Sequence, residues 1–324
     1  MKKIIKAFLC AAAALMLAAS LVSCGTKPAD KRVVMTVGGE KVLYDEFRYV
    51  FLNAKRDFDG GDSAYWQNGD REALEKNVLD VIKRSYAIEA MAKDFGVELD
   101  NDDKEYIQSY ISSFKKSFET EEEYLAALEN EYMSEWYFKR AVSVNTLWQK
   151  LYDYVTDMSS GVILTDDAAL AEDVRSNFYR AVYIYICNDE EDDAAQNRTA
   201  AETAAQRAEN GEDFSVLVEE YNEDAKMDKN PDGRYFTSGE LLSFFEEAVK
   251  ALDLNETSGV VEGNGGFYVI RRLPLDEQYI DENLETLRVS YMARRFNEML
   301  AERVLNADVV YTDLFETLTV EVVK

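Results

Sequence analysis

The most specific chemical motif of the chain lies near its start, where small residues precede a cysteine in residues 21–24 (LVSC). Three lysines within residues 1–6 form a positive flank, and residues 7–22 are almost wholly apolar. This is the pattern of an export signal, so we predict cleavage before Cys24 and acylation of its thiol. Acyl chains would tether the remaining chain to the outer face of a cell membrane. The alternative, an uncleaved anchor helix, needs a longer apolar run than this one.

The other reactive side chains exclude several kinds of catalysis. The chain contains no histidine, which excludes a Ser-His-Asp or Cys-His centre, a His-ligated zinc ion and a His proton shuttle. Of the three cysteines, Cys10 leaves with the predicted signal and Cys24 is acylated, so Cys187 has no partner for an intramolecular disulfide. Because Cys187 ends the apolar run VYIYI and lacks an activating imidazole, we expect a buried strand cysteine.

Carboxylates dominate the charged residues. The chain has 63 Asp and Glu against 36 Lys and Arg, a formal charge of −27. Phosphate backbones repel such a surface, so we expect no nucleic-acid partner, whereas basic polypeptides are attracted. Asp228, Asn230 and Asp232 have the spacing of half a calcium loop, but Gly239 stands where the twelfth-position glutamate belongs. We expect a solvated loop, no metal site and no cofactor.

The spacing of apolar residues predicts the elements that position these groups. Residues 33–37 and 41–43 have the pattern of two short strands around the turn Gly38-Gly39. Helical spacing starts at about Asp45, whose carboxylate we expect to cap the helix, and it returns over residues 71–157. Signals for helix boundaries within the second stretch are Gly96, Asp100 and the capping-box residues Thr120 and Glu123.

The second half mixes helices with strands. We expect Thr165 to cap a helix that runs to about Tyr179, followed by a strand over residues 181–187. The loops predicted between elements include residues 224–233. The remaining predictions are helices over residues 194–209, 214–221, 241–252 and 281–306, a strand over residues 267–273, and a strand-like tail over residues 309–323.

Five stretches in this half resemble a parvulin-type (PpiC-type) peptidyl-prolyl isomerase domain. They are NGEDFSVLVEEYNED (210–224), FTSGEL (236–241), FEEA (245–248), LDLNETSG (252–259) and GGFYVIR (265–271). Their order and spacing, more than any one of them, carry the resemblance. Earlier in the chain, MTVGGEK (35–41) and GVEL (96–99) resemble the chaperone domain of the PrsA and SurA families. The chain after its signal thus resembles the PrsA foldase lipoproteins over nearly its whole length.

The resemblance implies a site for twisting an X–Pro amide, whose barrier is about 18–20 kcal/mol. Its proline-binding slot would be formed by Phe236, Leu241 and Phe245, with Asp224 beside the isomerising bond. The family has a histidine on each of two neighbouring core strands, and here these positions hold Tyr183 and Tyr268. A phenol with a pKa near ~10 does not reproduce the charge behaviour of imidazole. We therefore expect the fold with weak or absent isomerase activity.

Together these expectations describe an α+β protein, in which a mostly helical chaperone-like domain is completed by a returning C-terminal helix. A parvulin-like α/β domain with a small antiparallel sheet is inserted into it. The expected divisions are a signal (1–23), a tether (24–32), a helical domain (33–175), a parvulin-like domain (176–276) and a C-terminal helix and tail packing back on the helical domain (277–324).

The expected function is that of a membrane-anchored, extracytoplasmic folding factor. Its partners would be unfolded or nascent secreted proteins and, through acylated Cys24, a lipid bilayer. Two alternatives stay open at this point. One is a catalytically active peptidyl-prolyl cis-trans isomerase. The other is a non-catalytic surface lipoprotein that serves as an adaptor for a fixed partner.

Overall fold

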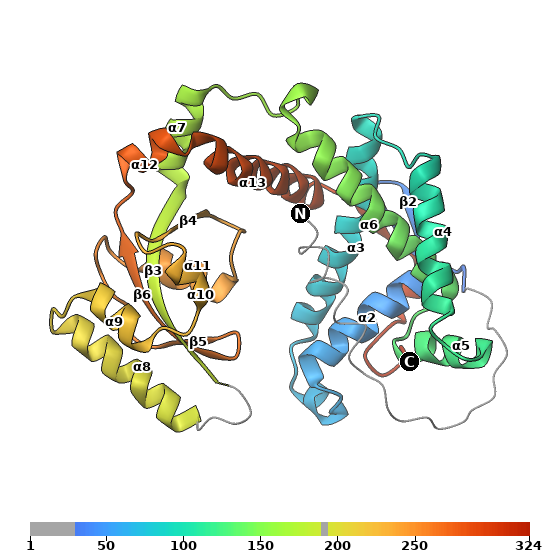
Figure 1. Ribbon diagram of the computed structural model, residues 1–324. Coiled ribbons are helices and arrows are strands. Elements are labelled where there is room, and N and C mark those ends of the chain that lie inside the picture. The colour runs from blue at the N-terminus through green and yellow to red at the C-terminus, as the bar shows by residue number, and fades with distance from the viewer. Residues whose placement is uncertain (1–29, 189–193) are drawn as a thin grey trace. The chain divides into compact units, whose positions relative to one another are not determined.

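The computed structural model describes residues 30–188 and 194–324, which form helices and two small antiparallel sheets (Figure 1). The α+β fold class is therefore confirmed. The chain divides into two compact units. Unit 1 contains the described residues up to Tyr86 with Leu99–Thr146 and Asp308–Lys324, and unit 2 contains Ala87–Glu98 and Leu147–Ala307.

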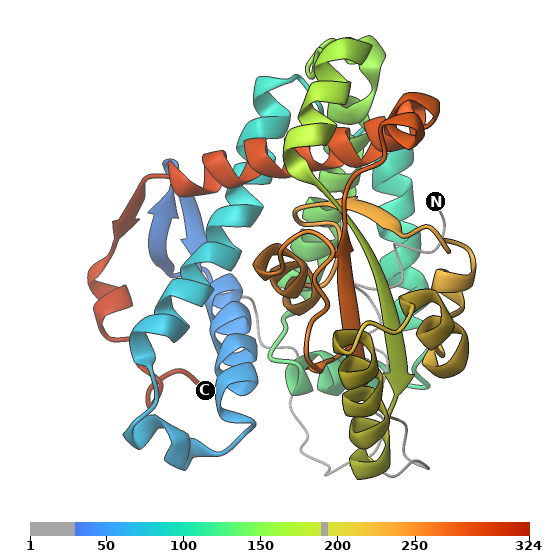
Figure 2. The same cartoon turned by 90° about the vertical axis from the view of Figure 1, so that its left-hand side faces the viewer.

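The sheet of unit 1 joins the two ends of the described chain. Its strand order is β2 (Glu40–Leu43), β1 (Val33–Val37), β7 (Val309–Tyr311), with all neighbours antiparallel. In Figure 2 the blue strands β1 and β2 lie beside the dark red β7. The predicted turn at Gly38-Gly39 is confirmed, with φ angles of 58° and 84° that favour glycine. The predicted strand-like tail is wrong beyond Tyr311, because the chain turns into α14 (Asp313–Glu316).

The first helix of unit 1 corrects one prediction. It begins at Tyr44, with Leu43 in the N-cap position and no side-chain cap, so Asp45 lies inside the first turn. The Tyr44 N–H is instead satisfied by the Arg32 carbonyl at 2.8 Å. A strand that leads directly into a helix thus makes a capping side chain unnecessary.

The other helices of unit 1 follow the predicted pattern closely. They comprise α2 (Tyr44–Asp59), the 3₁₀ turn η2 (Ser63–Gln67), α4 (Asn101–Lys115), α5 (Glu121–Asn130) and parts of α3 (Arg71–Asp94) and α6 (Glu135–Thr156). Aromatic rings of α4, α5 and α6 pack on one another, with Phe114 and Phe138 at 5.1 Å between centroids. Tyr124 and Phe138 are buried, so this aromatic cluster is core rather than open surface.

The sheet of unit 2 has the order β4 (Arg234–Thr237), β3 (Phe178–Cys187), β6 (Gly266–Leu273), β5 (Val261–Gly263), again antiparallel throughout. Figure 1 shows α8 and α9 on one side of this sheet and α11 on the other. The helices are α8 (Ala194–Glu209), α9 (Phe214–Tyr221), α10 (Ala225–Asp228) and α11 (Ser243–Ala251). The predicted loop over residues 224–233 therefore contains a short helix, and helix 241–252 is shorter than predicted.

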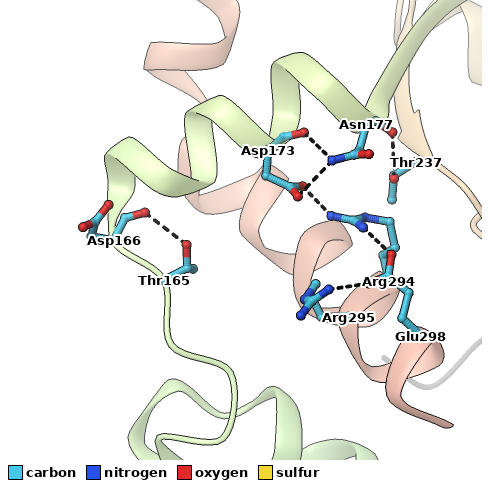
Figure 3. Close-up of polar contacts among 8 residues, drawn as sticks. All are labelled: Thr165, Asp166, Asp173, Asn177, Thr237, Arg294, Arg295 and Glu298. Carbon is cyan, nitrogen blue, oxygen red and sulfur yellow. Dashed lines mark hydrogen bonds and ion pairs between the residues drawn. The ribbon is translucent and has the colours of Figure 1, made fainter. Parts of the chain in front are cut away.

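Helix α7 (Asp167–Asn177) leads into β3, and its cap differs from the prediction. Asp166, not Thr165, is the N-cap: its carboxylate accepts from the Ala169 N–H at 2.8 Å. The Thr165 hydroxyl donates to the Asp166 carbonyl instead, as Figure 3 shows. Two adjacent capping residue types made the sequence ambiguous here.

The C-terminal helix is also broken where one helix was predicted. Asn283 separates α12 (Glu277–Glu282) from α13 (Leu284–Leu305). The Asn283 N–H closes the end of α12, and its carbonyl accepts from Thr286 and Leu287, so the same residue ends one helix and starts the next. Between α6 and α7 lies one more 3₁₀ turn, η3 (Met158–Ser160).

Helices α7 and α13 are joined by charged side chains (Figure 3). The Arg294 guanidinium donates to the Asp173 carboxylate at 2.5 Å and also pairs with Glu298. Asn177, at the end of α7, binds Asp173 with its amide and accepts at its carbonyl from the Thr237 hydroxyl of β4. This network ties the end of α7 both to α13 and to the end of β4.

Candidate functional site

The candidate site centres on Asp224, which lies between α9 and α10. One carboxylate oxygen, Oδ2, accepts a hydrogen bond of 2.8 Å from the Tyr183 hydroxyl. The other, Oδ1, accepts from the Lys226 N–H at 2.9 Å and so caps α10. The preceding Asn222 accepts from the Tyr185 N–H at 3.1 Å, which ties this loop to β3. Both oxygens of Asp224 are thus held in place by the protein itself.

The two tyrosines at the site are neutral phenols. Burial and the hydrogen bond to Asp224 raise the pKa of Tyr183 well above its usual value. Burial likewise raises the pKa of Tyr268. At neutral pH, Tyr183 therefore donates its proton to Asp224 without releasing it, and neither phenol can act as a base.

The aromatic residues predicted for the slot are brought together but are closed to solvent. The Phe245 ring lies 5.3 Å from that of Tyr183, 5.9 Å from that of Tyr268 and 6.0 Å from that of Phe236. Phe236 is 0% and Phe245 6% exposed, so both belong to the core of unit 2. Of the three predicted slot residues, only Leu241 is partly exposed.

The turn that carries Leu241 is built on one buried carboxylate. Glu246 of α11 accepts from the backbone N–H groups of Gly239, Glu240 and Leu241 at 2.9–3.1 Å. The Lys250 ammonium adds an ion pair at 3.2 Å, one helical turn away. Glu246 therefore positions the edge of the candidate slot although it does not face it.

Sequence reasoning missed Glu246 and also Phe244. The Phe244 ring lies 5.4 Å from that of Tyr268 and rests over Gly263, where an added Cβ would meet the ring. Together with Leu242, which is 52% exposed, it supplies apolar surface beside Leu241. The signal was present as two adjacent phenylalanines on one short helix, since both cannot face the same side.

Two cysteine predictions end differently. Cys24 lies outside the described residues. Cys187 is the last residue of β3, as expected for a strand, but it is only half-buried, so the expectation of a buried thiol is wrong. Its backbone N–H donates to Glu223 at 2.6 Å. The burial pattern along β3 shows that this end of the strand is less covered than its middle.

Comparisons with known proteins agree with this architecture. A family described as "SurA-like N-terminal domain" matches residues 1–152, and one described as "PPIC-type PPIASE domain" matches residues 171–273. The foldase protein PrsA of Caldanaerobacter subterraneus is 24% identical over 293 residues, 88% of each chain. PrsA of Halalkalibacterium halodurans is 25% identical, over 66% of this chain and 65% of its own.

A solved structure of foldase protein PrsA from Streptococcus pneumoniae is 20% identical and covers 80% of this chain and 96% of its own, with a TM-score of 0.35. The two domain matches define a protein that combines a SurA-like N-terminal domain with a parvulin domain. With the PrsA relatives, they identify the chain as a parvulin foldase of the PrsA/SurA type.

Proposed function

We propose that this protein is a membrane-anchored extracytoplasmic folding factor that binds unfolded secreted polypeptides, and that its parvulin domain is a weak isomerase or none. The observation that carries the second part is the Tyr183–Asp224 hydrogen bond in a chain without histidine. A PrsA foldase relative that matches 88% of the chain supports the first part.

To act as an isomerase, the site would have to twist an X–Pro amide. Catalysis requires an apolar wall for the proline ring and polar groups that stabilise the twisted amide better than the planar one. Here the proton of Tyr183 is already donated to Asp224, and both oxygens of Asp224 are already acceptors. With Phe236 and Phe245 packed in the core, little of the wall is open.

The attachment to a membrane rests on the sequence. Residues 21–24 supply the acylation motif, and Cys24 would carry the lipid. Within residues 30–188 and 194–324, no helix combines the length and the apolar character needed to cross a bilayer. Growth with labelled palmitate tests the anchor. Label on the protein that Cys24→Ser removes supports it, and an unlabelled protein refutes it.

We also propose that the chain is divided into a tether (24–32), a helical domain (33–175), a parvulin-like domain (176–276) and a C-terminal segment (277–324).

An aggregation assay tests the folding function. The purified protein at equimolar ratio should delay the aggregation of an unfolded client, followed by light scattering. A folded acidic protein of similar size serves as the control for unspecific charge effects. If the two traces coincide, the proposed chaperone function is wrong. A pull-down that recovers one stoichiometric partner instead of many unfolded clients would favour the adaptor.

A proline-limited refolding reaction tests the isomerase. Uncatalysed, it takes tens to hundreds of seconds. We expect no acceleration by catalytic amounts of the protein, and acceleration upon Tyr183→His combined with Tyr268→His. Acceleration by the unaltered protein that Asp224→Ala abolishes would establish the active-isomerase alternative instead.

A further inference from the structure

Unit 1 contains an apolar cavity of ≈ 280 Å³ that is separate from the candidate site of unit 2. Its walls come from α2, α3 and the C-terminal segment. They include Phe47 and Phe51 of α2, Leu74 and Val78 of α3, and Phe315 and Leu318 near the chain end. We refer to it as the tail pocket. Its volume lies just below the roughly 300–1,000 Å³ typical of small-molecule sites, a size suited to one large side chain.

Aromatic contacts and hydrogen bonds hold the walls of the tail pocket in place. The Phe315 ring stacks on Tyr311 at 4.3 Å and meets Phe47 edge-on at 5.9 Å. Beyond it, the chain end is fixed by two hydrogen bonds between the Arg71 guanidinium and the Glu321 carboxylate, of 2.6 and 3.1 Å. The pocket is therefore a formed feature of unit 1.

The mouth of the tail pocket is acidic. Glu75 and Glu316 line it and are exposed, and their carboxylates make no hydrogen bond or ion pair with any residue of the described chain. Arg71 also lines it, but its guanidinium is engaged by Glu321 and by the Trp66 carbonyl at 3.1 Å. An occupant with a positive charge next to its apolar part would thus complement both the walls and the mouth.

We propose that the tail pocket binds an aromatic or branched aliphatic side chain of an unfolded polypeptide, next to a lysine or arginine that pairs with Glu75 or Glu316. This inference rests on the proposed folding function and names the client chemistry that the site selects. The net charge of −27 draws basic segments towards the protein, and the pocket then distinguishes the apolar ones among them.

The first test uses the unaltered protein and two fluorescein-labelled pentapeptides, followed by anisotropy. One is Lys-Lys-Phe-Leu-Lys, and in the other every lysine is glutamate. The basic peptide should bind at least tenfold more tightly, and raising the salt concentration should weaken its binding. Equal affinities, or no binding of the basic peptide at millimolar concentration, would overturn the inference.

The second test fills the pocket. Thr319 is exposed on its lining, so Thr319→Trp should place an indole inside and weaken binding of the basic peptide at least tenfold. Thr317→Trp, two residues away and outside the lining, is the matched control. Unchanged affinity of the folded Thr319→Trp protein would show that the peptide binds elsewhere and would overturn the inference.

The third test removes the charges at the mouth. Glu75→Gln combined with Glu316→Gln should weaken the basic peptide about fivefold at low salt. Glu72→Gln combined with Glu122→Gln changes the net charge equally, outside the pocket, and should leave the affinity within twofold. Equal losses in both pairs would reduce the effect to net charge and overturn the inference.

The aggregation assay separates this inference from the proposed function. If the protein delays aggregation but Thr319→Trp binds the peptide normally, the tail pocket is wrong and the folding function stands. If Thr319→Trp loses peptide binding while the unaltered protein fails to delay aggregation, the pocket stands and the folding function fails.

Discussion

The carboxylate of Glu246 should determine whether the edge of the candidate slot is ordered. It is buried, and it accepts from three consecutive backbone N–H groups, those of residues 239–241, at 2.9–3.1 Å. One oxygen, Oε1, accepts from all three, and the other, Oε2, accepts from Gly239 N–H and from the Lys250 ammonium, so an amide nitrogen in the place of Oε2 would face two donors. Removing this charge should therefore loosen the turn that presents Leu241.

The expected magnitude follows from these contacts. Hydrogen bonds to charged groups contribute about 1.5–3 kcal/mol each, but an amide in the same place keeps one acceptor oxygen. Glu246→Gln should thus cost about 2 kcal/mol of local stability, and Glu246→Ala about 4 kcal/mol because three N–H groups lose their partner. Glu247→Gln changes the neighbouring, exposed residue of the same helix and should stay within about 0.5 kcal/mol.

Hydrogen–deuterium exchange measures this loss where it occurs. A cost of about 2 kcal/mol should speed exchange of the amides at residues 239–241 about 30-fold in Glu246→Gln. Peptides from α4 in unit 1 should exchange at unchanged rates. If exchange in Glu246→Gln matches that in Glu247→Gln, the carboxylate does not organise the turn and the reasoning fails.

Three further predictions concern other contacts. Burial alone would raise the pKa of Asp59, but hydrogen bonds from Lys55, Trp66 and the Gly61 N–H together outweigh it and lower that pKa. Asp59→Asn should therefore destabilise the protein at pH 7, and the difference in thermal midpoint should fade below about pH 4. Arg294→Met should lower the free energy of unfolding in urea by about 3 kcal/mol, because the partly buried carboxylate of Asp173 loses its ion-pair partner. Arg295→Met, which removes an exposed ion pair with Glu298, should change it little. Gly266→Ala should cost about 3 kcal/mol of stability, because the added Cβ would overlap a backbone carbonyl across the strand pair. Gly265→Ala should cost about 1 kcal/mol, because its Cβ meets no atom and only the φ of 72° is unfavourable. Equal shifts of the thermal midpoint in the two variants would contradict this.

Local signals predicted the elements well because their partners lie close in the chain. Thr120 accepts from the Glu123 N–H at 3.2 Å, and Glu123 returns the bond, as the capping-box spacing predicted. Gly96 ends α3 with a φ of 67°, again as predicted. Each of these features depends on residues no more than four apart, so the sequence alone contains the whole interaction.

The errors arise where a distant partner decides the structure. Strands β4 and β5, with four and three residues, were not predicted, because only pairing with β3 and β6 makes such short segments strands. In the C-terminal tail the sequence has β-type residues throughout, yet only Val309–Tyr311 finds a partner, in β1. The remaining tail pairs with no strand of the described chain and forms α14 and turns instead.

The residues of the candidate site also lie far apart in the sequence, so local signals could not bring them together. Asp224 and Tyr183 are 41 residues apart, and only the resemblance to parvulins brought them together before their 2.8 Å hydrogen bond was seen. Burial could not be predicted in this way, because a phenylalanine that forms a slot wall and one that fills a core are the same residue in the sequence. Phe236 and Phe245 stand at the positions that the resemblance assigns to the slot wall, but their side chains are as buried as core residues.

The tyrosines explain this closure physically. A phenol is larger than an imidazole, and Tyr183 and Tyr268 add two rings to the space around Phe245, all within 6 Å of one another. Edge-on aromatic contacts of this kind stabilise a packed core by about 0.5–1.5 kcal/mol each beyond area burial. By the resemblance to parvulins, tyrosine in place of histidine would remove the titratable group and close the slot in the same step, so introducing both histidines should create space at Phe245 as well as an imidazole. A histidine pair at these positions that leaves the refolding of proline-limited clients unaccelerated would contradict this explanation.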